Sequence, residues 1–200
     1  MKFRPLSIAG AVEITPQQHG DPRGLFTEWY RFDLLAAEVG HPLRLAQGNL
    51  SVSARGVVRG IHYADVPPGQ AKYVTCTRGA VLDVIVDLRV GSRTFGQWDA
   101  VRLDDVDRRA VYIGEGLGHG FCALTDDATL TYLCSETYNP QGEHAVHPLD
   151  PDLAIQWPVE GVPTLSARDD AAPTLREARS RGALPDLATC EQYTQSLRGQ

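Results

Sequence analysis

The chain has 200 residues, of which 42% are hydrophobic and 22% charged, as is ordinary for one soluble globular domain with a sizeable core. Its formal net charge of −6 argues against nucleic acid as a partner, because phosphate backbones bind basic faces. No apolar run has the length of a membrane span or of a secretion signal, and the four cysteines lack C-x-x-C spacing, so we expect a reduced, cytoplasmic protein.

The first forty residues predict only short elements. Ala11–Ile14 has the composition of a strand. Asp33–Val39 is typical of a short helix, with Asp33 as its N-cap and Gly40 as its stop.

From about residue 43 to residue 137 the sequence alternates between short β-favouring runs and turn signals such as Arg78-Gly79. Closely spaced short strands are typical of a β-sandwich or a small barrel. The predicted strands are Leu45–Ser53, Val57–Tyr63, Lys72–Thr77, Ala80–Arg89, Trp98–Leu103, Arg109–Ile113, Gly120–Leu124 and Thr129–Glu136.

The strand Ala80–Arg89 carries Asp83 and Asp87 on the same face as Val81 and Ile85. Such a mixed face fits either the lining of a cavity or a solvated outer face, and the alternation does not decide between them. After Asn139-Pro140 the chain reads as loop, up to a short helix over about 172–181 with Pro173 in its first turn and Gly182 after its end. We therefore expect one domain over 1–200, with its core at 43–137 and a loop and helix region at 139–190.

The segment Arg59-Gly60-Ile61-His62-Tyr63 is followed ten residues after His62 by Lys72. An imidazole next to a fixed cation suits proton abstraction beside a carbonyl group, with the cation stabilising the oxyanion. A surface histidine and a surface lysine are the alternative interpretation of the same two residues.

Eight motifs, in order from about residue 3 to residue 187, resemble the dTDP-4-dehydrorhamnose 3,5-epimerase family, including its antibiotic-sugar 3- or 5-epimerase relatives. These motifs are Asp21-x-Arg23-Gly24-x-Phe26, Gln47-x-Asn49-x-Ser51, Arg59-Gly60-Ile61-His62-Tyr63, Pro68-x-Gln70-Ala71-Lys72-Tyr73-Val74, Gly116-x-Gly118-His119-Gly120-Phe121, Tyr132-x-Cys134-x3-Tyr138-x-Pro140, Asp150-Pro151 and Ser166-Ala167-Arg168-Asp169. The resemblance implies an all-β, cupin-type jelly-roll β-sandwich with short flanking helices.

The activity implied by the resemblance is epimerisation of dTDP-4-keto-6-deoxy-D-glucose through an enolate, in rhamnose or antibiotic-sugar biosynthesis. By this resemblance His62 is the base, Asp169 the carboxylate that orients it, Tyr132 the acid and Lys72 the cation at the enolate oxygen. The substrate-binding residues implied in the same way are Arg23, Phe26, Glu28, Gln47, Asn49, Arg59, His119, Tyr138, Glu143 and Arg168. For Tyr132 a core strand tyrosine is the alternative, and the polar binding residues read equally as surface groups.

A metal-binding cupin is a rival interpretation, and its motifs are incomplete. Gly56 and His62 fit the first motif, but Ala64 stands where the second histidine is needed and no glutamate follows at the expected distance. Two histidines do not make the ligand sets that zinc or iron require. We therefore expect no metal and no cofactor.

Two points stay open in the sequence. On a regular strand Arg59 and His62 face opposite sides, so a bulge or kink at Gly60 is needed to bring both into one cavity. We expect inversion at carbon 3 and at carbon 5, with a carbon-3-only epimerase and a non-catalytic sugar-nucleotide-binding cupin as the alternatives.

The resemblance also implies a homodimer with exchanged N-terminal strands, in which Arg23 can reach the neighbour's site.

Overall fold

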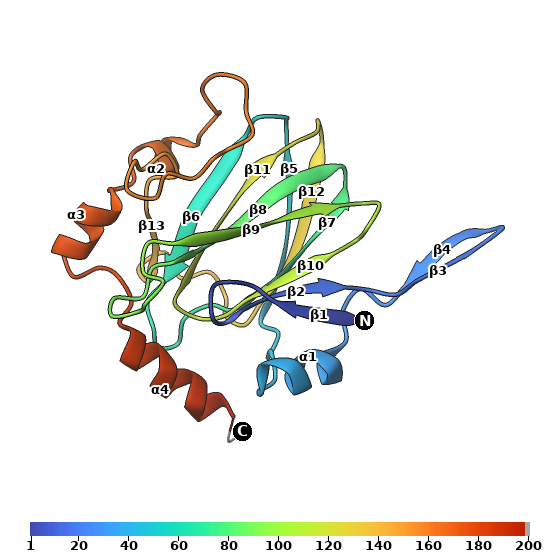
Figure 1. Cartoon of the computed structure of the whole chain (residues 1–200), viewed down its shortest axis with the longest axis horizontal. Coiled ribbons are helices and arrows are strands. Elements are labelled where there is room, and N and C mark those ends of the chain that lie inside the picture. The colour runs from blue at the N-terminus through green and yellow to red at the C-terminus, as the bar shows by residue number, and fades with distance from the viewer. Residues whose placement is uncertain (199–200) are drawn as a thin grey trace.

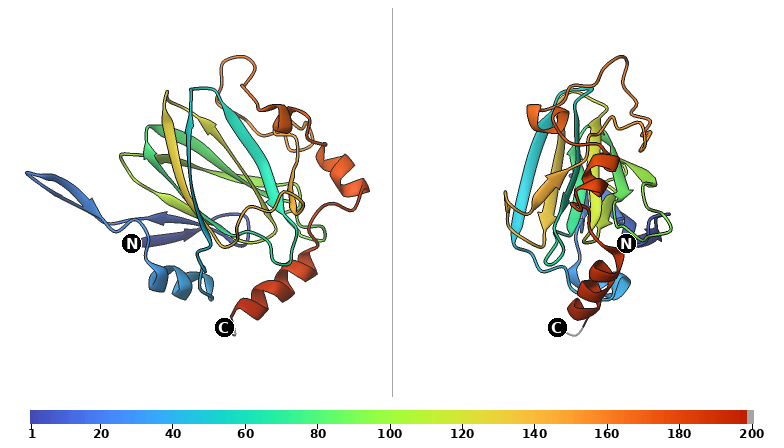
Figure 2. Two further views of the ribbon diagram at one scale, coloured as in Figure 1. Left: turned by 180° about the vertical axis from the view of Figure 1, so that it is seen from behind. Right: turned by 90° about the vertical axis from the view of Figure 1, so that its left-hand side faces the viewer.

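The computed structural model describes residues 1–198, which form two antiparallel sheets packed face to face, with a projecting hairpin and four short helices (Figures 1 and 2). This arrangement confirms the all-β sandwich. Among these residues no helix is both long enough and apolar enough to cross a membrane.

The first sheet has six strands in the order β1-β2-β10-β7-β12-β5. Their bounds are β1 (Lys2–Pro5), β2 (Ala11–Thr15), β10 (Ala110–Ile113), β7 (Lys72–Arg78), β12 (Ala128–Cys134) and β5 (Gln47–Ser53). The second sheet has five strands in the order β13-β6-β11-β8-β9. Their bounds are β13 (Glu143–Ala145), β6 (Val58–Ala64), β11 (Leu117–Ala123), β8 (Ala80–Asp87) and β9 (Trp98–Asp104).

The main core lies between the two sheets, because alternate residues of their strands point inward. Val74 and Leu130 of the first sheet meet Ile85 and Leu103 of the second, all fully buried. A second apolar cluster covers the outer face of the five-stranded sheet with the C-terminal segment, and a third covers part of the six-stranded sheet with α1. Both faces of β8 are therefore buried, so the face that carries Asp83 and Asp87 is internal rather than solvated.

The helices differ from the sequence-based expectation at their N-termini. Helix α1 spans Phe32–Val39 and begins after Arg31, so the expectation that Asp33 is the N-cap is wrong; Asp33 instead pairs with the Arg31 guanidinium. The stop at Gly40 is confirmed, since Gly40 has the left-handed φ of 84° that a glycine adopts without strain.

The C-terminal region has more regular structure than a loop. It contains α2 (Ala167–Asp170), α3 (Leu175–Ser180) and α4 (Leu187–Leu197) in addition to β13. Thr174 caps α3 through a reciprocal bond with Glu177, so Pro173 lies before this helix and not in its first turn. Helices α2 and α3 lie beside β6 and β13, whereas α4 lies next to α1 at the other end of the sandwich (Figure 1).

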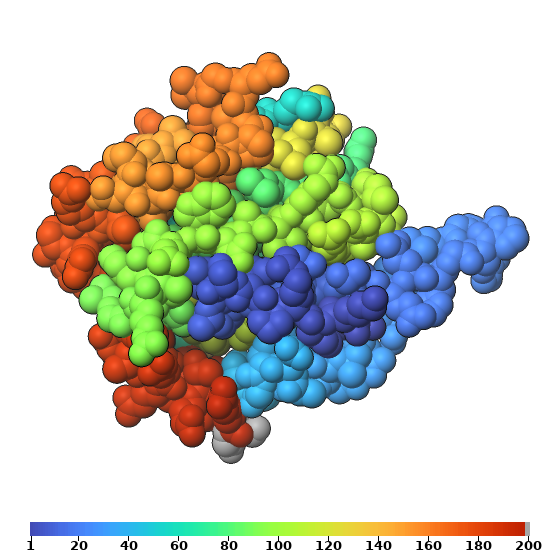
Figure 3. Space-filling model, in the orientation of Figure 1, coloured from blue at the N-terminus to red at the C-terminus, as the bar shows by residue number. Residues whose placement is uncertain are grey.

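A two-stranded hairpin of β3 (Gln18–Asp21) and β4 (Gly24–Thr27) pairs with neither sheet. It projects from the body of the molecule as an arm, as Figure 3 also shows. Its tip exposes Leu25 and Phe26, the latter at 66% of its surface.

Candidate active site

His62 and Asp169 form a hydrogen-bonded pair at one side of the interior of the sandwich. His62 lies on β6, and its Nε2 is 2.7 Å from Oδ1 of Asp169. An ionised carboxylate only accepts hydrogen bonds, so Nε2 carries a proton, and in the neutral imidazole the lone pair of Nδ1 is left free. Burial alone would raise the pKa of Asp169, but hydrogen bonds from His62 and Ser166 hold that pKa below its usual value. The pair therefore combines an ionised acceptor with an oriented imidazole.

The local sequence explains how Asp169 reaches this position. Ser166 caps α2 by accepting the backbone N–H of Asp169 at 3.1 Å, which begins a helix of four residues. Asp169 is 2% exposed and faces inward onto β6. The Ser166 N-cap thus holds the Asp169 carboxylate next to Nε2 of His62.

Lys72 and Tyr132 come from the opposite sheet. Lys72 is the first residue of β7, and Tyr132 lies on the neighbouring β12, where it is paired with Val74. Both line the pocket of about 330 Å³ that His62 also lines. Burial raises the pKa of Tyr132, so its hydroxyl keeps its proton at neutral pH. Burial lowers the pKa of Lys72, although Cys134 and nearby carboxylates act in the other direction.

Strand β6 has a bulge at Gly60, where the sequence analysis expected a bulge or kink. Arg59 pairs with Phe121 and His62 pairs with His119, so three steps on β6 match two steps on β11. Gly60 has φ +134°, and a Cβ there would lie 2.5 Å from Cα of Gly120. The bulge is therefore confirmed, and it depends on close contact between two glycine backbones.

Arg59 lies beside this bulge with its side chain reaching toward β5. Its Nε donates to Oγ of Ser53 at 3.1 Å. The Arg59 charge acts to lower the pKa of Tyr132, against the stronger effect of burial. A guanidinium close enough to act on Tyr132 suits binding of a phosphate group beside the pocket.

His119 lies next to His62 across the β6–β11 ladder. Its Nε2 is 2.8 Å from Oδ2 of Asp83, a carboxylate that is fully buried. Both imidazoles are thus held by carboxylates, and both line a small pocket beside Lys72. Asp83 was missed as a site residue, although the aspartates on the apolar strand Ala80–Arg89 were the signal for it.

A polar network forms the rim of the main pocket. Gln47 donates to Asn49 at 2.8 Å and accepts the backbone N–H of Tyr138 at the same distance. Gln70 donates to Glu143 at 3.3 Å. Gln70 was also missed as a site residue, despite its place in the motif before Lys72.

Tyr138 and Arg168 complete the rim. Tyr138 is 55% exposed and lines the pocket. Arg168 donates to the backbone oxygen of Glu143 at 3.1 Å. Apart from Gln70, these rim residues were expected from the sequence.

Three residues expected at the site lie away from this chain's pocket. Arg23 and Phe26 lie on the β3–β4 arm, where Arg23 pairs with Asp21. Glu28 lies at the base of the arm and pairs with Arg31 at 3.3 Å. The chain brings none of them near His62.

The donor set of the pocket does not resemble a metal centre. Residues 1–198 contain no group of three histidine, cysteine or carboxylate side chains placed to hold an ion. The two histidines of the pocket direct Nε2 toward carboxylates, as described above. The arrangement can instead remove a proton on one side of a bound molecule, return one on the other, and stabilise an oxyanion between them.

Comparisons with known proteins give a consistent result. Residues 5–177 match the family described as dTDP-4-dehydrorhamnose 3,5-epimerase. The chain is 66% identical to a dTDP-4-dehydrorhamnose 3-epimerase of Streptomyces niveus, over 97% of this chain and 93% of that protein. It is 58% identical to a dTDP-4-dehydrorhamnose 3,5-epimerase of Mycolicibacterium smegmatis, over 99% and 98%. Among solved structures it is similar to ChmJ, a 3'-monoepimerase of Streptomyces bikiniensis in complex with dTDP-quinovose, with a TM-score of 0.95 and 51% identity over 98% and 99% of the chains.

Proposed function

The chain belongs to the dTDP-4-dehydrorhamnose 3,5-epimerase family, a family of dTDP-sugar epimerases, and from this premise we propose that it inverts carbons 3 and 5 of dTDP-4-keto-6-deoxy-D-glucose. The 4-keto group acidifies the protons on both neighbouring carbons. Removal of either proton gives an enolate, and return of a proton from the opposite face inverts the carbon.

The observation that carries this proposal is the division of the reacting groups between the two sheets. We assign the free Nδ1 of His62 as the base, on the five-stranded sheet. We assign the Tyr132 hydroxyl as the acid, on the six-stranded sheet. A sugar ring between the two sheets has one group on each face, which is the requirement for inversion. Lys72, beside Tyr132, is assigned to the enolate oxygen.

The nucleotide end of the substrate fits the rim of the pocket. Arg59 and Arg168 offer guanidinium groups for the diphosphate, and Tyr138 offers an exposed aromatic face for the base. The ligand of the solved Streptomyces bikiniensis relative, dTDP-quinovose, supports a dTDP-sugar as the substrate. The assignment needs no cofactor, and we keep cofactor independence as part of the proposal.

The number of inverted carbons is the finer part of the proposal. Similar proteins include both a 3-epimerase and a 3,5-epimerase. The complete set of His62, Lys72 and Tyr132 favours exchange at both carbons. We expect carbon 3 to exchange first, because inversion of carbon 5 requires the ring to flip or the sugar to turn in the pocket.

The test is incubation of dTDP-4-keto-6-deoxyglucose with the enzyme in deuterated water, followed by proton NMR. Loss of the proton signals at carbons 3 and 5, with inversion at both, supports the proposal. Deuterium at carbon 3 alone over many turnovers would replace it with a 3-epimerase. Absence of any exchange above a sample without enzyme would leave a sugar-nucleotide-binding protein.

We further propose that the protein acts as a homodimer in which each β3–β4 arm reaches the partner's site. The arm cannot serve its own pocket without leaving its position, and it exposes Phe26 and Leu25. Strand β5 is an edge strand whose outward residues Leu50 and Val52 are 66% and 52% exposed. An unpaired edge and an exposed apolar face support association with a second copy.

A further inference from the structure

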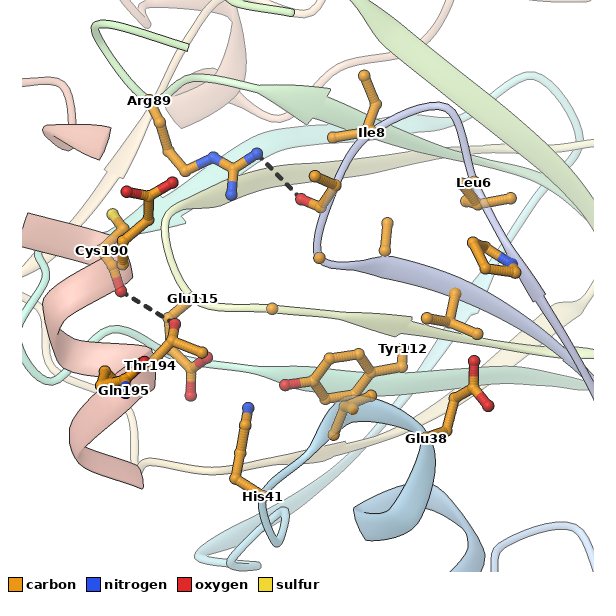
Figure 4. A pocket seen from close by; sticks show the side chains of 18 of the residues that line it. Leu6, Ile8, Glu38, His41, Arg89, Tyr112, Glu115, Cys190, Thr194 and Gln195 are labelled. Atoms are coloured by element: carbon orange, nitrogen blue, oxygen red, sulfur yellow. Dashed lines mark hydrogen bonds between the residues drawn. The ribbon is translucent and has the colours of Figure 1, made fainter. Parts of the chain in front are cut away.

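A second cavity, of about 600 Å³, lies outside the active-site pocket. It is enclosed by the turn between β1 and β2, the end of α1, the turn between β10 and β11, and helix α4 (Figure 4). It shares no lining residue with the pocket that holds His62. Its volume falls in the range of sites that bind small molecules.

Two buried polar groups in this cavity have free hydrogen-bonding capacity. Tyr112 is 2% exposed, and its hydroxyl has no hydrogen-bond partner among residues 1–198. His41 is 5% exposed, and its Nδ1 lies 3.4 Å from the carbonyl oxygen of Pro42. A proton on Nδ1 makes that contact a donation and leaves the lone pair of Nε2 free. Burial lowers the pKa of His41, so the ring is neutral and accepts at Nε2.

Glu115 is the third polar group, and it lacks a cation. Glu115 is 7% exposed, and its carboxylate makes no ion pair within the described part of the chain. The nearby Arg89, which also lines the cavity, pairs with Asp87 through Nε at 2.8 Å and donates from Nη2 to the oxygen of Ala9 at 2.9 Å. An unpaired buried carboxylate is costly, and burial raises the pKa of Glu115.

The cavity has an apolar side as well. Leu6, Ile8 and Val12 line it and are each at most 8% exposed. Figure 4 shows Leu6 and Ile8 on the side away from Glu115 and His41. A ligand that fits both sides carries a hydrogen-bond-donating head and a short hydrocarbon body.

We propose that this cavity binds a small primary amine, with its ammonium group at Glu115 and its hydrocarbon body against Leu6 and Ile8. An ammonium group has three N–H donors and no acceptor. The Glu115 carboxylate, the Tyr112 hydroxyl and Nε2 of His41 supply three acceptors. The ligand cation also removes the charge imbalance that an ionised Glu115 creates in this cavity.

Binding should depend on pH because the cation selects the ionised form of Glu115. A carboxyl group with a raised pKa is partly protonated where an ordinary glutamate is not, so affinity should fall as the pH is lowered toward that raised pKa. The other ionisable groups around this cavity are Tyr112, His41, Arg89, Cys190, Tyr193, Glu136, Glu38, Glu191 and Arg198, and the Arg198 charge acts to lower the pKa of His41. Of these, His41 also titrates in the acidic range, and its protonation acts in the same direction by removing an acceptor.

The experiment is titration calorimetry of the full-length protein in phosphate buffer with n-butylamine, n-butanol and butyrate, which share one hydrocarbon body. We expect n-butylamine to bind and the other two to bind at least about tenfold more weakly, since hydrogen bonds to charged groups are the stronger ones. Equal binding of the alcohol, or no binding of the amine at millimolar concentration, would overturn the proposal. Saturating dTDP should not compete, and competition would place the amine in the active-site pocket and also overturn it.

Variants locate the binding site. Glu115→Gln should weaken n-butylamine binding by about tenfold or more and reduce its pH dependence to the part that His41 contributes. Glu191→Gln is the matched control, because Glu191 lines the same cavity but is exposed, and it should bind as the wild type does. Tyr112→Phe provides a second, nearly isosteric variant and should bind more weakly. Unchanged affinity in Glu115→Gln and Tyr112→Phe would exclude this cavity as the site.

Discussion

At the scale of single residues, the free Nδ1 atom of His62 is the group on which turnover should depend most. His62→Ala removes the proposed base, and a general base is typically worth roughly 10²–10⁴-fold in rate. Asp169→Asn keeps the shape of the pair but takes away the ionised acceptor, so we expect a large but smaller loss. Steady-state turnover of the folded variants measures both effects. Near-normal epimerisation by His62→Ala would disprove the assignment of the base.

Substitution of Tyr132 should separate proton removal from inversion. Burial keeps its hydroxyl protonated, so Tyr132→Phe should leave proton removal intact while inversion slows sharply. Proton NMR in deuterated water measures exchange and inversion in one sample. Equal loss of exchange and inversion would indicate a role for Tyr132 in binding or folding instead.

At the scale of elements, the bulge in β6 should depend on Gly60. A side chain there meets the backbone of Gly120, in addition to the strain of a positive φ. We expect Gly60→Ala to destabilise the fold by clearly more than the roughly 1–2 kcal/mol that a left-handed backbone costs an alanine. Urea unfolding measures this change in the free energy of unfolding.

Gly56→Ala is the matched control for that measurement. Gly56 also has a positive φ, of +79°, but an added Cβ would meet no atom within 4 Å. It should therefore show the cost of the backbone conformation alone. Equal destabilisation by the two variants would mean that the contact with Gly120 contributes nothing.

Helix α2 positions a carboxylate through its N-cap. Ser166→Ala should cost about 1 kcal/mol of stability and reduce turnover, because the cap holds Asp169 behind His62. Thr174→Ala removes the comparable cap of α3, which carries no residue of the site. It should cost similar stability and leave turnover near the wild-type rate. Thermal melts and steady-state turnover are measured for both variants. Equal turnover of Ser166→Ala and Thr174→Ala would show that Ser166 does not position Asp169 for the reaction.

The sequence predicted elements best where local pattern and tertiary packing agree. From residue 43 to residue 137 the sequence alternates short β-favouring runs with turn signals, so the existence of these strands follows from the local pattern. The N-cap at Asp33 was wrong because its carboxylate is drawn to Arg31. Pro173 was misplaced because the stronger signal was the capping box of Thr174 and Glu177 one residue later.

The residues of the candidate site were likewise predicted where a local motif marks them and missed where only tertiary pairing does. The motifs predicted His62, Lys72 and Tyr132, which the structure places around one pocket, and strand parity predicted the bulge at Gly60. Asp83 was missed because its partner, His119, lies on another strand, 36 residues away in the sequence. Such a pairing depends on which strands become neighbours, and no local pattern contains that information.

At the scale of the whole molecule, the projecting arm allows a test of which subunit Arg23 serves. Arg23→Ala and His62→Ala should each be strongly impaired alone. When the two variants are co-expressed as mixed dimers, one site of each mixed dimer regains both residues if Arg23 acts across the interface. Random assortment would then restore about a quarter of wild-type turnover, since half of the dimers are mixed and half of their sites are complete.

The control is co-expression of His62→Ala with Asp169→Asn. These two residues lie in one subunit's site, so their mixed dimers should contain no complete site. Recovery with the Arg23 variant but not with the Asp169 variant supports the exchanged arms. No recovery in either mixture would place Arg23 in its own subunit's site or outside the site.

The spacing of the two sheets has a consequence for how this enzyme can diversify. Packed sheets lie about 10 Å apart, which accommodates a hexose ring with one hydrogen bond on each side. If His62 and Tyr132 act as proposed, facial selectivity is set by the two sheets that carry them, whereas the choice of nucleotide and of ring substituents is set by loops and side chains at the rim. Substitutions at the rim can change which sugar enters, while opposite-face proton delivery is inherited with the architecture.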